Sequence, residues 1–155
     1  MKTKLCLLIL LIVGLSVQLS ANPINGLLER IDKGASKKFV IEFKKGADDF
    51  FELDQKGTKV VVRGNNYVNI ATGINWYLKY YAGIQLSWNG MQAKLPQVLP
   101  PVSRKERHET SLSLRYDFNY CTYSYTMAFW DWERWEKEID WMALHGINLP
   151  LAAVG

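Results

Sequence analysis

The sequence predicts an α/β chain in two parts: a small α+β sandwich N-terminal domain, then a β-α-β unit. Residues 22–107 combine short apolar strand patterns with two amphipathic helical patterns, which is typical of helices packed on one face of a largely antiparallel sheet. Residues 108–155 change from period two to helical spacing and then to an apolar run, which predicts strand, crossover helix and parallel strand.

Residues 1–21 have the pattern of a secretory signal peptide. Lys2 and Lys4 precede an apolar stretch, and Ala21 offers a cleavage site before Asn22. A membrane anchor is the weaker alternative, because the apolar stretch is shorter than the roughly 20 residues that a span needs. We therefore expect a secreted or periplasmic protein with no stable membrane span after the leader is removed.

The elements of the first domain follow from local signals. Asn22 and Pro23 predict the start of a helix, because Asn is a favoured N-cap and Pro suits the first helical position. A longer helix is predicted after Gly64, ending at Gly83. Strands are predicted at residues 38–43, 50–54, 59–63 and 84–88. The prolines between residues 96 and 101 and the polar run 103–110 predict a linker.

Alternating apolar and polar residues over 114–121 predict the first strand of the second part. Asn119 and Cys121 fall on its polar face near its end, and Tyr125 follows in the loop. In folds built from repeated β-α units, binding residues lie at the C-terminal ends of the parallel strands and in the loops after them. An amide could hydrogen-bond a ligand there, and an aromatic ring could pack on its apolar face. From the residues alone, an edge strand whose polar face meets water is the alternative.

The crossover helix is predicted to begin after Asp131, a suitable N-cap, and to end before Gly146, which suits a left-handed position. Apolar residues at helical spacing form a stripe expected to pack against the core: Trp132, Trp135, Ile139, Met142 and Gly146. Oppositely charged residues lie at i,i+4 spacing on the remaining surface: Glu133 with Lys137, and Arg134 with Glu138. The carboxylates of this helix therefore predict a solvated or salt-bridged face, and residues 147–155 predict a buried parallel strand.

The composition is that of an ordinary globular protein and predicts no nucleic-acid partner. The formal net charge of +4 falls to +2 without Lys2 and Lys4, since 17 Lys and Arg then face 15 Asp and Glu without a basic stripe. Cys6 lies in the leader, which leaves Cys121 as a single thiol without a disulfide partner. No Cys and His cluster has metal spacing, so we expect no metal and no cofactor.

A dense set of residues near the end of the chain carries a family resemblance: Arg115-Tyr116, Asn119, Cys121-Thr122, Ser124-Tyr125, Trp130-Asp131-Trp132, Trp135-Glu136, Ile139-Asp140-Trp141-Met142-Ala143-Leu144, Gly146-Ile147-Asn148 and Leu151-Ala152. This stretch resembles the start of the catalytic barrel of glycoside hydrolase family 89, the α-N-acetylglucosaminidases. The resemblance implies that the β-α-β unit is the first unit of a truncated (β/α)8 barrel. It departs from the family pattern at Phe129 and at Asp117-Phe118. The first domain is similar to the small domains that precede the barrel in several glycosidase families, in layout more than in motif.

The resemblance implies a retaining glycoside hydrolase whose partner is a glycan with terminal α-linked N-acetylglucosamine. It implies substrate-binding roles for Asn119, Cys121 and Tyr125 and two catalytic glutamates, about 5–5.5 Å apart, on later barrel strands. A barrel takes about 250 residues, so we expect no catalytic residue within this chain, and the chain alone should be inactive. A non-catalytic carbohydrate-binding or interaction module is the alternative, and the oligomeric state stays open.

Overall fold

The computed structural model describes residues 22–151, so the predicted signal peptide and residues 152–155 lie outside the described part. In chain order the elements are α2 (Pro23–Ile31), the short 3-10 helix η1 (Ala35–Lys38), β1 (Phe39–Phe43), β2 (Asp49–Lys56), β3 (Lys59–Gly64), α3 (Tyr67–Tyr80), β4 (Glu106–Thr110), β5 (Tyr116–Asp117), α4 (Tyr120–Tyr125), the 3-10 helix η2 (Met127–Phe129), α5 (Trp132–Leu144) and β6 (Leu149–Pro150). Among the described residues, no helix is long and apolar enough to cross a membrane.

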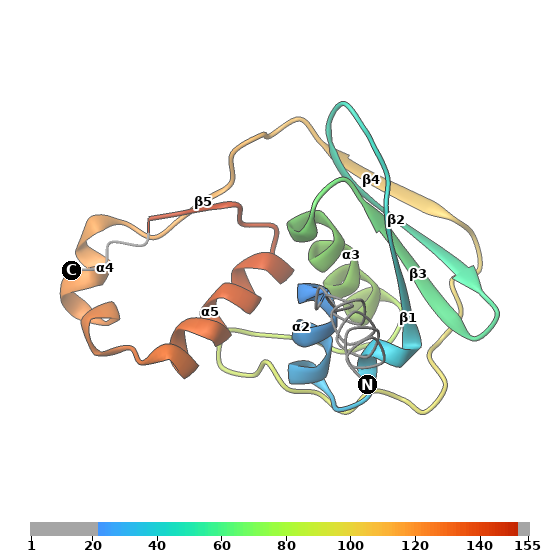
Figure 1. Ribbon diagram of the computed structural model, residues 1–155, viewed down its shortest axis with the longest axis horizontal. Helices are drawn as coiled ribbons and strands as arrows, with labels where there is room; N and C mark the ends of the chain where they lie inside the picture. Colours follow the sequence, from blue (N-terminus) through green and yellow to red (C-terminus); the bar gives the residue numbers. More distant parts are fainter. Residues whose placement is uncertain (1–21, 152–155) are drawn as a thin grey trace, which may run out of the picture.

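The first domain is built on a four-stranded sheet in the order β1-β3-β2-β4. β1 runs parallel to β3, whereas β2 is antiparallel to both β3 and β4. Helices α2 and α3 lie along one side of this sheet, and α5 lies beyond α3 on the side away from the sheet (Figure 1). The helices on one face and the mainly antiparallel pairing confirm the predicted α+β layout.

The core lies between the sheet and α3. Its centre is formed by fully buried apolar side chains from α2, the strands and α3: Leu28, Leu53, Val60, Val62, Ile70, Ile74, Tyr77 and Leu78. A Cβ atom at Gly73 would lie 2.9 Å from Val62 Cγ1, so α3 approaches the sheet more closely there than a side chain would allow. Leu144 of α5 is also fully buried in this cluster, so the second part of the chain shares the core of the first.

The predicted strand at residues 84–88 is wrong. The segment between α3 and β4 runs without a regular strand, and Ser87 and Gly90 instead close a tight turn through two reciprocal backbone hydrogen bonds of 3.0 Å. The Tyr77 hydroxyl donates to Pro100 O at 2.5 Å, which fixes this segment against α3. Burial raises the pKa of Tyr77 to about 12, so the hydroxyl keeps its proton for this bond.

The fourth strand is β4, which lies in the predicted linker and continues past residue 107. Its side chains alternate between two environments. The His108 ring stacks on Phe51 and packs at a tilt against Trp76, with ring centroids 4.9 and 4.3 Å apart, whereas Arg107 pairs with Glu52 across the strands at 3.0 Å. The polar composition of residues 106–110 therefore gave no strand signal, because the residues that pair with this strand lie elsewhere in the sequence.

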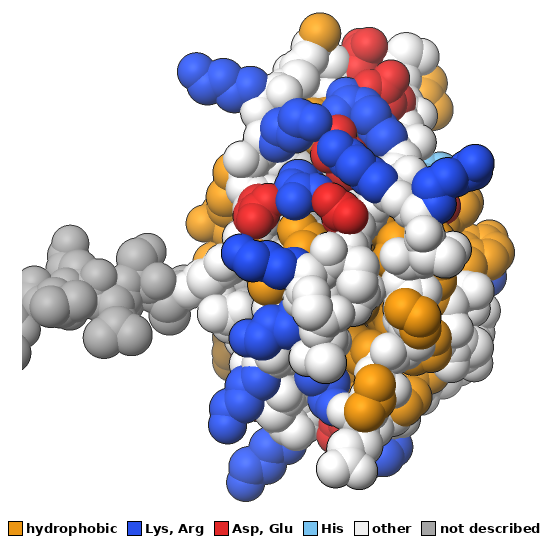
Figure 2. Space-filling model, turned by 90° about the vertical axis from the view of Figure 1, so that its right-hand side faces the viewer, with side chains coloured by type: hydrophobic (Ala, Val, Ile, Leu, Met, Phe, Trp, Pro, Cys, Tyr) orange, Lys and Arg blue, Asp and Glu red, His pale blue; other side chains and the backbone are white. Residues whose placement is uncertain are grey.

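The outer face of the sheet carries a buried carboxylate among cations. Glu52 is only 3% exposed in its side chain and lies 2.7 Å from Lys44 Nζ, 3.1 Å from Lys105 Nζ and 3.0 Å from Arg107 Nη1. Burial raises its pKa, but the contacts with these three cations outweigh burial and hold the pKa at about 2. Figure 2 views the side of the molecule on which the sheet lies and shows Lys and Arg side chains gathered there around carboxylates.

The second part forms the predicted β-α-β unit, with β5 and β6 parallel and α5 between them. The prediction that its second strand is buried is wrong within the described residues, because β6 spans Leu149–Pro150 and both residues are exposed. The Asp131 carboxylate caps α5 by accepting from Arg134 N at 2.8 Å, and Gly146 follows the helix at φ 79°, as predicted. The predicted strand at 114–121 is wrong beyond residue 117, because β5 ends at Asp117 and α4 begins at Tyr120.

The predicted apolar stripe of α5 is wrong at two positions. Trp132 is 70% exposed and Ile139 is 45% exposed, so neither packs against the core. Two carboxylates, Glu138 and Asp140, are buried on this helix instead. Both carboxylates can be buried because donors satisfy their charges: Arg30 binds Asp140, and Trp88 and Arg134 bind Glu138.

Candidate functional site

The candidate site lies where β5 and β6 end. The two strands are parallel, so their C-terminal ends meet at one edge, where Leu151 N donates to Asp117 O at 3.0 Å. Residues 118–131 leave β5 at this edge and contain α4 and η2; we call them the β5 loop. In Figure 1 α4 lies at the end of the molecule farthest from the four-stranded sheet.

Asn119 is the N-cap of α4 and does not end a strand. Its Oδ1 accepts from Cys121 N at 2.9 Å and from Thr122 N at 3.2 Å. The expectation that Asn119 and Cys121 share a polar strand face is therefore wrong, because the chain has already turned into a helix. The Asn119 side chain is exposed, and its amide nitrogen makes no hydrogen bond to the described residues.

The three predicted site residues nevertheless lie on one short segment beyond the end of β5. Cys121, a free thiol, is half-buried in the first turn of α4, and Tyr125 is its last residue with 76% of its surface exposed. Their i,i+4 spacing places them on the same side of α4. The structure thus brings Asn119, Cys121 and Tyr125 to the edge where a barrel binds substrate, and their roles stay predictions.

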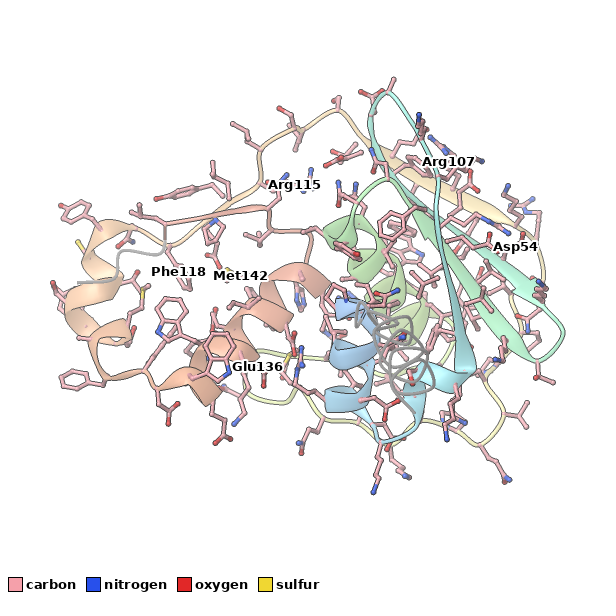
Figure 3. All side chains as sticks on the ribbon, viewed as in Figure 1. Asp54, Arg107, Arg115, Phe118, Glu136 and Met142 are labelled. Carbon is pink, nitrogen blue, oxygen red and sulfur yellow. The ribbon has the colours of Figure 1, made fainter. Side chains whose placement is uncertain are left out.

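Phe118 enters this loop in an unusual backbone conformation. Its φ of 71° makes it the non-glycine residue with a positive φ among the described residues, and such a conformation is costly for a bulky side chain. Phe118 N donates to the Asp117 carboxylate at 2.8 Å, and its ring lies 6.0 Å from the Trp130 ring. Figure 3 shows the Phe118 side chain directed into the space between β5 and α5, where Met142 also lies.

A cluster beneath the β5 loop joins it to α5 and to the first domain. The buried Glu138 carboxylate accepts at one oxygen, Oε2, from Trp88 Nε1 at 2.7 Å and from Arg134 Nη2 at 2.6 Å. The Arg134 guanidinium carbon lies 4.9 Å from the centroid of the Trp88 ring and 4.1 Å from that of the Trp130 ring. Neither the buried carboxylate nor its tryptophan partner was predicted, since Trp88 and Glu138 are 50 residues apart.

A hollow of about 360 Å³ lies between this cluster and the loop. Its walls come from the first domain, the β5 loop and α5: Trp88, Asp117, Phe118, Thr122, Thr126, Trp130, Glu138 and Trp141. The buried carboxylate in this lining is that of Glu138, and its Oε2 accepts from both donors. The two carboxylates of this lining both accept hydrogen bonds from neighbouring groups: Asp117 from Phe118 N, and Glu138 from Trp88 and Arg134.

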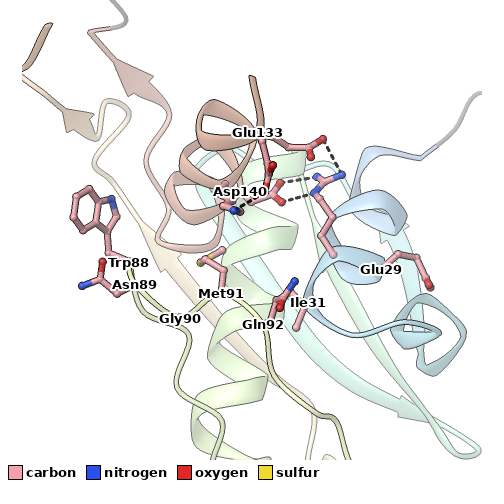
Figure 4. Close-up of a pocket in the computed structure, with 12 residues that line it drawn as sticks. Glu29, Ile31, Trp88, Asn89, Gly90, Met91, Gln92, Glu133 and Asp140 are labelled. Atoms are coloured by element: carbon pink, nitrogen blue, oxygen red, sulfur yellow. Dashed lines mark hydrogen bonds and ion pairs between the residues drawn. The ribbon is translucent and has the colours of Figure 1, made fainter. Parts of the chain in front are cut away.

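A larger groove of about 530 Å³ lies between α2, the turn at residues 88–92 and α5 (Figure 4). Arg30 crosses it and binds Asp140 through Nε–Oδ2 at 2.6 Å and Nη2–Oδ1 at 2.7 Å, and it lies 3.3 Å from Glu136. The hydrogen bonds with Asp140 raise the pKa of Arg30. Because Asp140 and Glu136 share this arginine, they form an ion-pair network that confirms the salt-bridged face predicted for α5.

Arg115 anchors the opposite end of β5 to the first domain. Its Nη2 donates to Asp49 Oδ2 at 2.8 Å and to Asn69 Oδ1 at 3.3 Å, and its Nε donates to Gly146 O. Burial acts to raise the pKa of Asp49, but the Arg115 contact and neighbouring amides lower it overall. Figure 3 shows Arg115 between β5 and α3, so one side chain fixes where β5 starts.

Large aromatic side chains are exposed around the β5 loop. They are Tyr120, Tyr125, Phe129 and Trp132, and the neighbouring strand end adds Leu149 and Leu151. Among the described residues, no group of His, Cys, Asp and Glu could hold a metal ion. The chemistry available in this region is therefore hydrogen bonding by an amide and hydroxyls, together with apolar contact from aromatic rings.

Comparison with known proteins matches both parts of the chain. Residues 22–101 match the family model of the α-N-acetylglucosaminidase (NAGLU) N-terminal domain, and residues 115–155 match that of the NAGLU TIM-barrel domain. The chain is 41% identical over 124 residues to human α-N-acetylglucosaminidase, which covers 80% of this chain and 17% of that protein.

Solved structures of a family 89 glycoside hydrolase from Clostridium perfringens have the same arrangement. Its complex with 2-acetamido-1,2-dideoxynojirimycin superposes with a TM-score of 0.82 at 38% identity, covering 86% of this chain and 16% of that one. A variant with two Glu-to-Gln changes, bound to its substrate GlcNAc-α-1,4-galactose, gives 0.80 at 39% identity, covering 83% and 15%. The chain thus spans about one sixth of the length of these relatives. With both of its parts matched in order, the chain belongs to the α-N-acetylglucosaminidase family, glycoside hydrolase family 89.

Proposed function

We propose that this chain forms the N-terminal part of a secreted retaining glycoside hydrolase that releases terminal α-linked N-acetylglucosamine from glycans. The observation that carries the proposal is the β5 loop, an amide- and tyrosine-bearing segment at the C-terminal edge of two parallel strands that match the barrel of this family. We call the longer enzyme of which these residues would form the start the parent enzyme.

In the parent enzyme the β5 loop would form part of the wall of the sugar pocket. The Asn119 amide NH2 would donate to the sugar while its oxygen keeps α4 in place. Tyr125, exposed at the end of α4, would offer a hydroxyl and an aromatic face. Cys121 would close the wall between them as a shallow, half-buried contact.

The bond-breaking step would need two carboxyl groups. One carboxylate attacks the anomeric carbon while the other, as an acid, protonates the departing glycosidic oxygen; water then cleaves the glycosyl–enzyme bond with retention. The carboxylates of α5 are engaged by Arg30, Arg134 and Lys137, so they are not candidates for these roles. We place both catalytic glutamates on later strands of the parent enzyme.

Hydrolysis of matched aryl glycosides tests the proposal. The parent enzyme should release the aryl group from an α-N-acetylglucosaminide and leave the β anomer intact, and proton NMR should show the α anomer of the sugar as the first product. The 155-residue chain should show no turnover above background. A parent enzyme that cleaves only the β-linked substrate, or neither, would contradict the assignment.

Export of the parent enzyme is a separate part of the proposal. We expect cleavage before Asn22, because Lys2 and Lys4 precede an apolar stretch that ends near the small residue Ala21. Mass spectrometry of protein recovered from the culture medium or periplasm should find an N-terminus near Asn22. Recovery there of protein that still begins at Met1 would show that the leader is not processed.

A further inference from the structure

The turn at residues 87–90 brings an aromatic side chain of the first domain to α5. Reciprocal backbone hydrogen bonds of 3.0 Å between Ser87 and Gly90 close the turn, so Trp88 stands at its tip on a fixed backbone. In Figure 4 Trp88 lies at one end of the groove beside α5. The first domain thus touches the barrel unit at the helix that follows the β5 loop.

Glu138 orients the two side chains that donate to its carboxylate, Trp88 and Arg134. Its side chain is 1% exposed, and a buried carboxylate is costly unless donors surround it. Trp88 and Arg134 supply those donors at one oxygen atom, from opposite sides of the interface between first domain and barrel unit. The carboxylate therefore holds one nitrogen of the Arg134 guanidinium beside Trp88.

The guanidinium then holds the end of the β5 loop. It contacts the rings of Trp88 and Trp130, and a flat, weakly hydrated guanidinium suits such a contact better than an ammonium group does. Trp130 in turn meets Phe118, whose positive φ must be held by its surroundings. The contacts run without interruption from Trp88 to the residue that precedes Asn119.

We propose that Trp88 and Arg134 are positioning residues through which the first domain holds the β5 loop in the arrangement that presents Asn119 and Tyr125 to substrate. The proposal rests on the proposed function of the same loop. It assigns the first domain a part in substrate recognition, although none of its residues lies in the predicted pocket. Trp88 and Arg134 act here through Trp130 and Phe118 and do not touch the sugar.

Steady-state kinetics of parent-enzyme variants test this role. Arg134→Lys keeps the charge but loses the planar contact, and Trp88→Phe keeps a ring but loses the donor to Glu138. Because misplaced binding groups weaken substrate binding, each variant should raise KM about tenfold and change kcat less than about threefold. Arg30→Lys is the matched control, since Arg30 also ties α5 to the first domain but contacts no residue of the β5 loop.

Melting temperatures of the same variants separate positioning from general loss of stability. Arg30→Lys should lower the melting temperature at least as much as Arg134→Lys and leave KM unchanged. Each variant should also be combined with Tyr125→Phe. The changes in the free energy derived from kcat/KM should be non-additive for Arg134→Lys, because Arg134 acts on the loop that carries Tyr125, and additive for Arg30→Lys, which contacts no residue of that loop.

The outcomes are distinct. Wild-type KM in both Arg134→Lys and Trp88→Phe would overturn the positioning role while leaving the proposed function intact, provided the parent enzyme hydrolyses the α-linked substrate. Equal KM increases in the Arg30→Lys control would also overturn it, since the effect would then follow the interface as a whole. A wild-type parent enzyme without activity on that substrate would remove the proposed function and this role together.

Discussion

The two ends of the Asn119 side chain have separate roles in this account. The oxygen caps α4, whereas the amide nitrogen makes no hydrogen bond to the described residues and is exposed at the strand edge. The sequence pattern predicted Asn119 near the end of the first strand of the unit, but placed it on the strand itself, whereas the strand ends at Asp117. The pattern could not reveal the helix because α4 has only six residues and begins two residues after Phe118, whose positive φ turns the chain.

Substitution by aspartate separates the two roles of Asn119. In the parent enzyme Asn119→Asp should keep the melting temperature, because Asp caps helices as well as Asn. It should lower kcat/KM about tenfold or more, as a lost hydrogen bond in a desolvated site costs about 1–3 kcal/mol. Asn119→Ala should lose both the cap and the activity. An Asn119→Asp variant with wild-type kcat/KM would show that the residue serves only the cap.

Glu52 gives the first domain a pH dependence of known sign. Its pKa in the folded protein, about 2, lies below the ordinary value of 4.5, so the stabilisation is fully present above about pH 4.5 and is lost as pH falls through 2. Glu52→Gln should therefore cost roughly 2–3 kcal/mol of unfolding free energy at pH 6 and much less at pH 2. Urea unfolding at both pH values measures the difference.

Glu133→Gln is the control for this measurement, because Glu133 is 76% exposed and its pair with Lys137 should contribute little at either pH. A cost of Glu52→Gln that is equal at pH 6 and pH 2 would contradict the view that the ionised carboxylate is what stabilises the sheet.

Among the elements, those with local signals were predictable and those with distant partners were not. The first three strands, α2, α3 and α5 follow from periodicity and from caps such as Asn22 and Asp131. β4 could not be recognised, because its Arg107 and His108 become strand residues only through Glu52, Phe51 and Trp76. The buried face of α5 was missed for the same reason, since Arg30 and Asp140 are 110 residues apart.

The close packing of α3 on the sheet gives a prediction for one element. Gly73→Ala should cost about 1–3 kcal/mol of unfolding free energy, because the new methyl group would lie 2.9 Å from Val62 Cγ1 and 3.1 Å from Phe51 Cβ. Lys79→Ala on the exposed side of the same helix should change stability by less than about 0.5 kcal/mol. Urea denaturation compares the two variants, and a stabilising Gly73→Ala would show that helix propensity outweighs the close approach.

At the scale of the whole molecule, the two parts are not joined by a linker alone. Leu144 completes the core of the first domain, and Arg30 and Arg115 bind buried or half-buried carboxylates across the boundary. The sequence predicted two parts in the correct order, but it could not predict this interface, because each contact joins residues distant along the chain. The first domain therefore supports α5 and both ends of the unit that carries the candidate site.

The central claim is that the β5 loop forms part of the sugar pocket of the parent enzyme, and hydrogen exchange tests it most directly. Amide exchange should be compared with and without 2-acetamido-1,2-dideoxynojirimycin, the ligand bound by the Clostridium perfringens relative. We expect slower exchange on binding in peptides that cover residues 116–131 and unchanged exchange in peptides from β1, β2 and β3 at residues 39–64. Saturating ligand that leaves residues 116–131 unchanged would contradict the account.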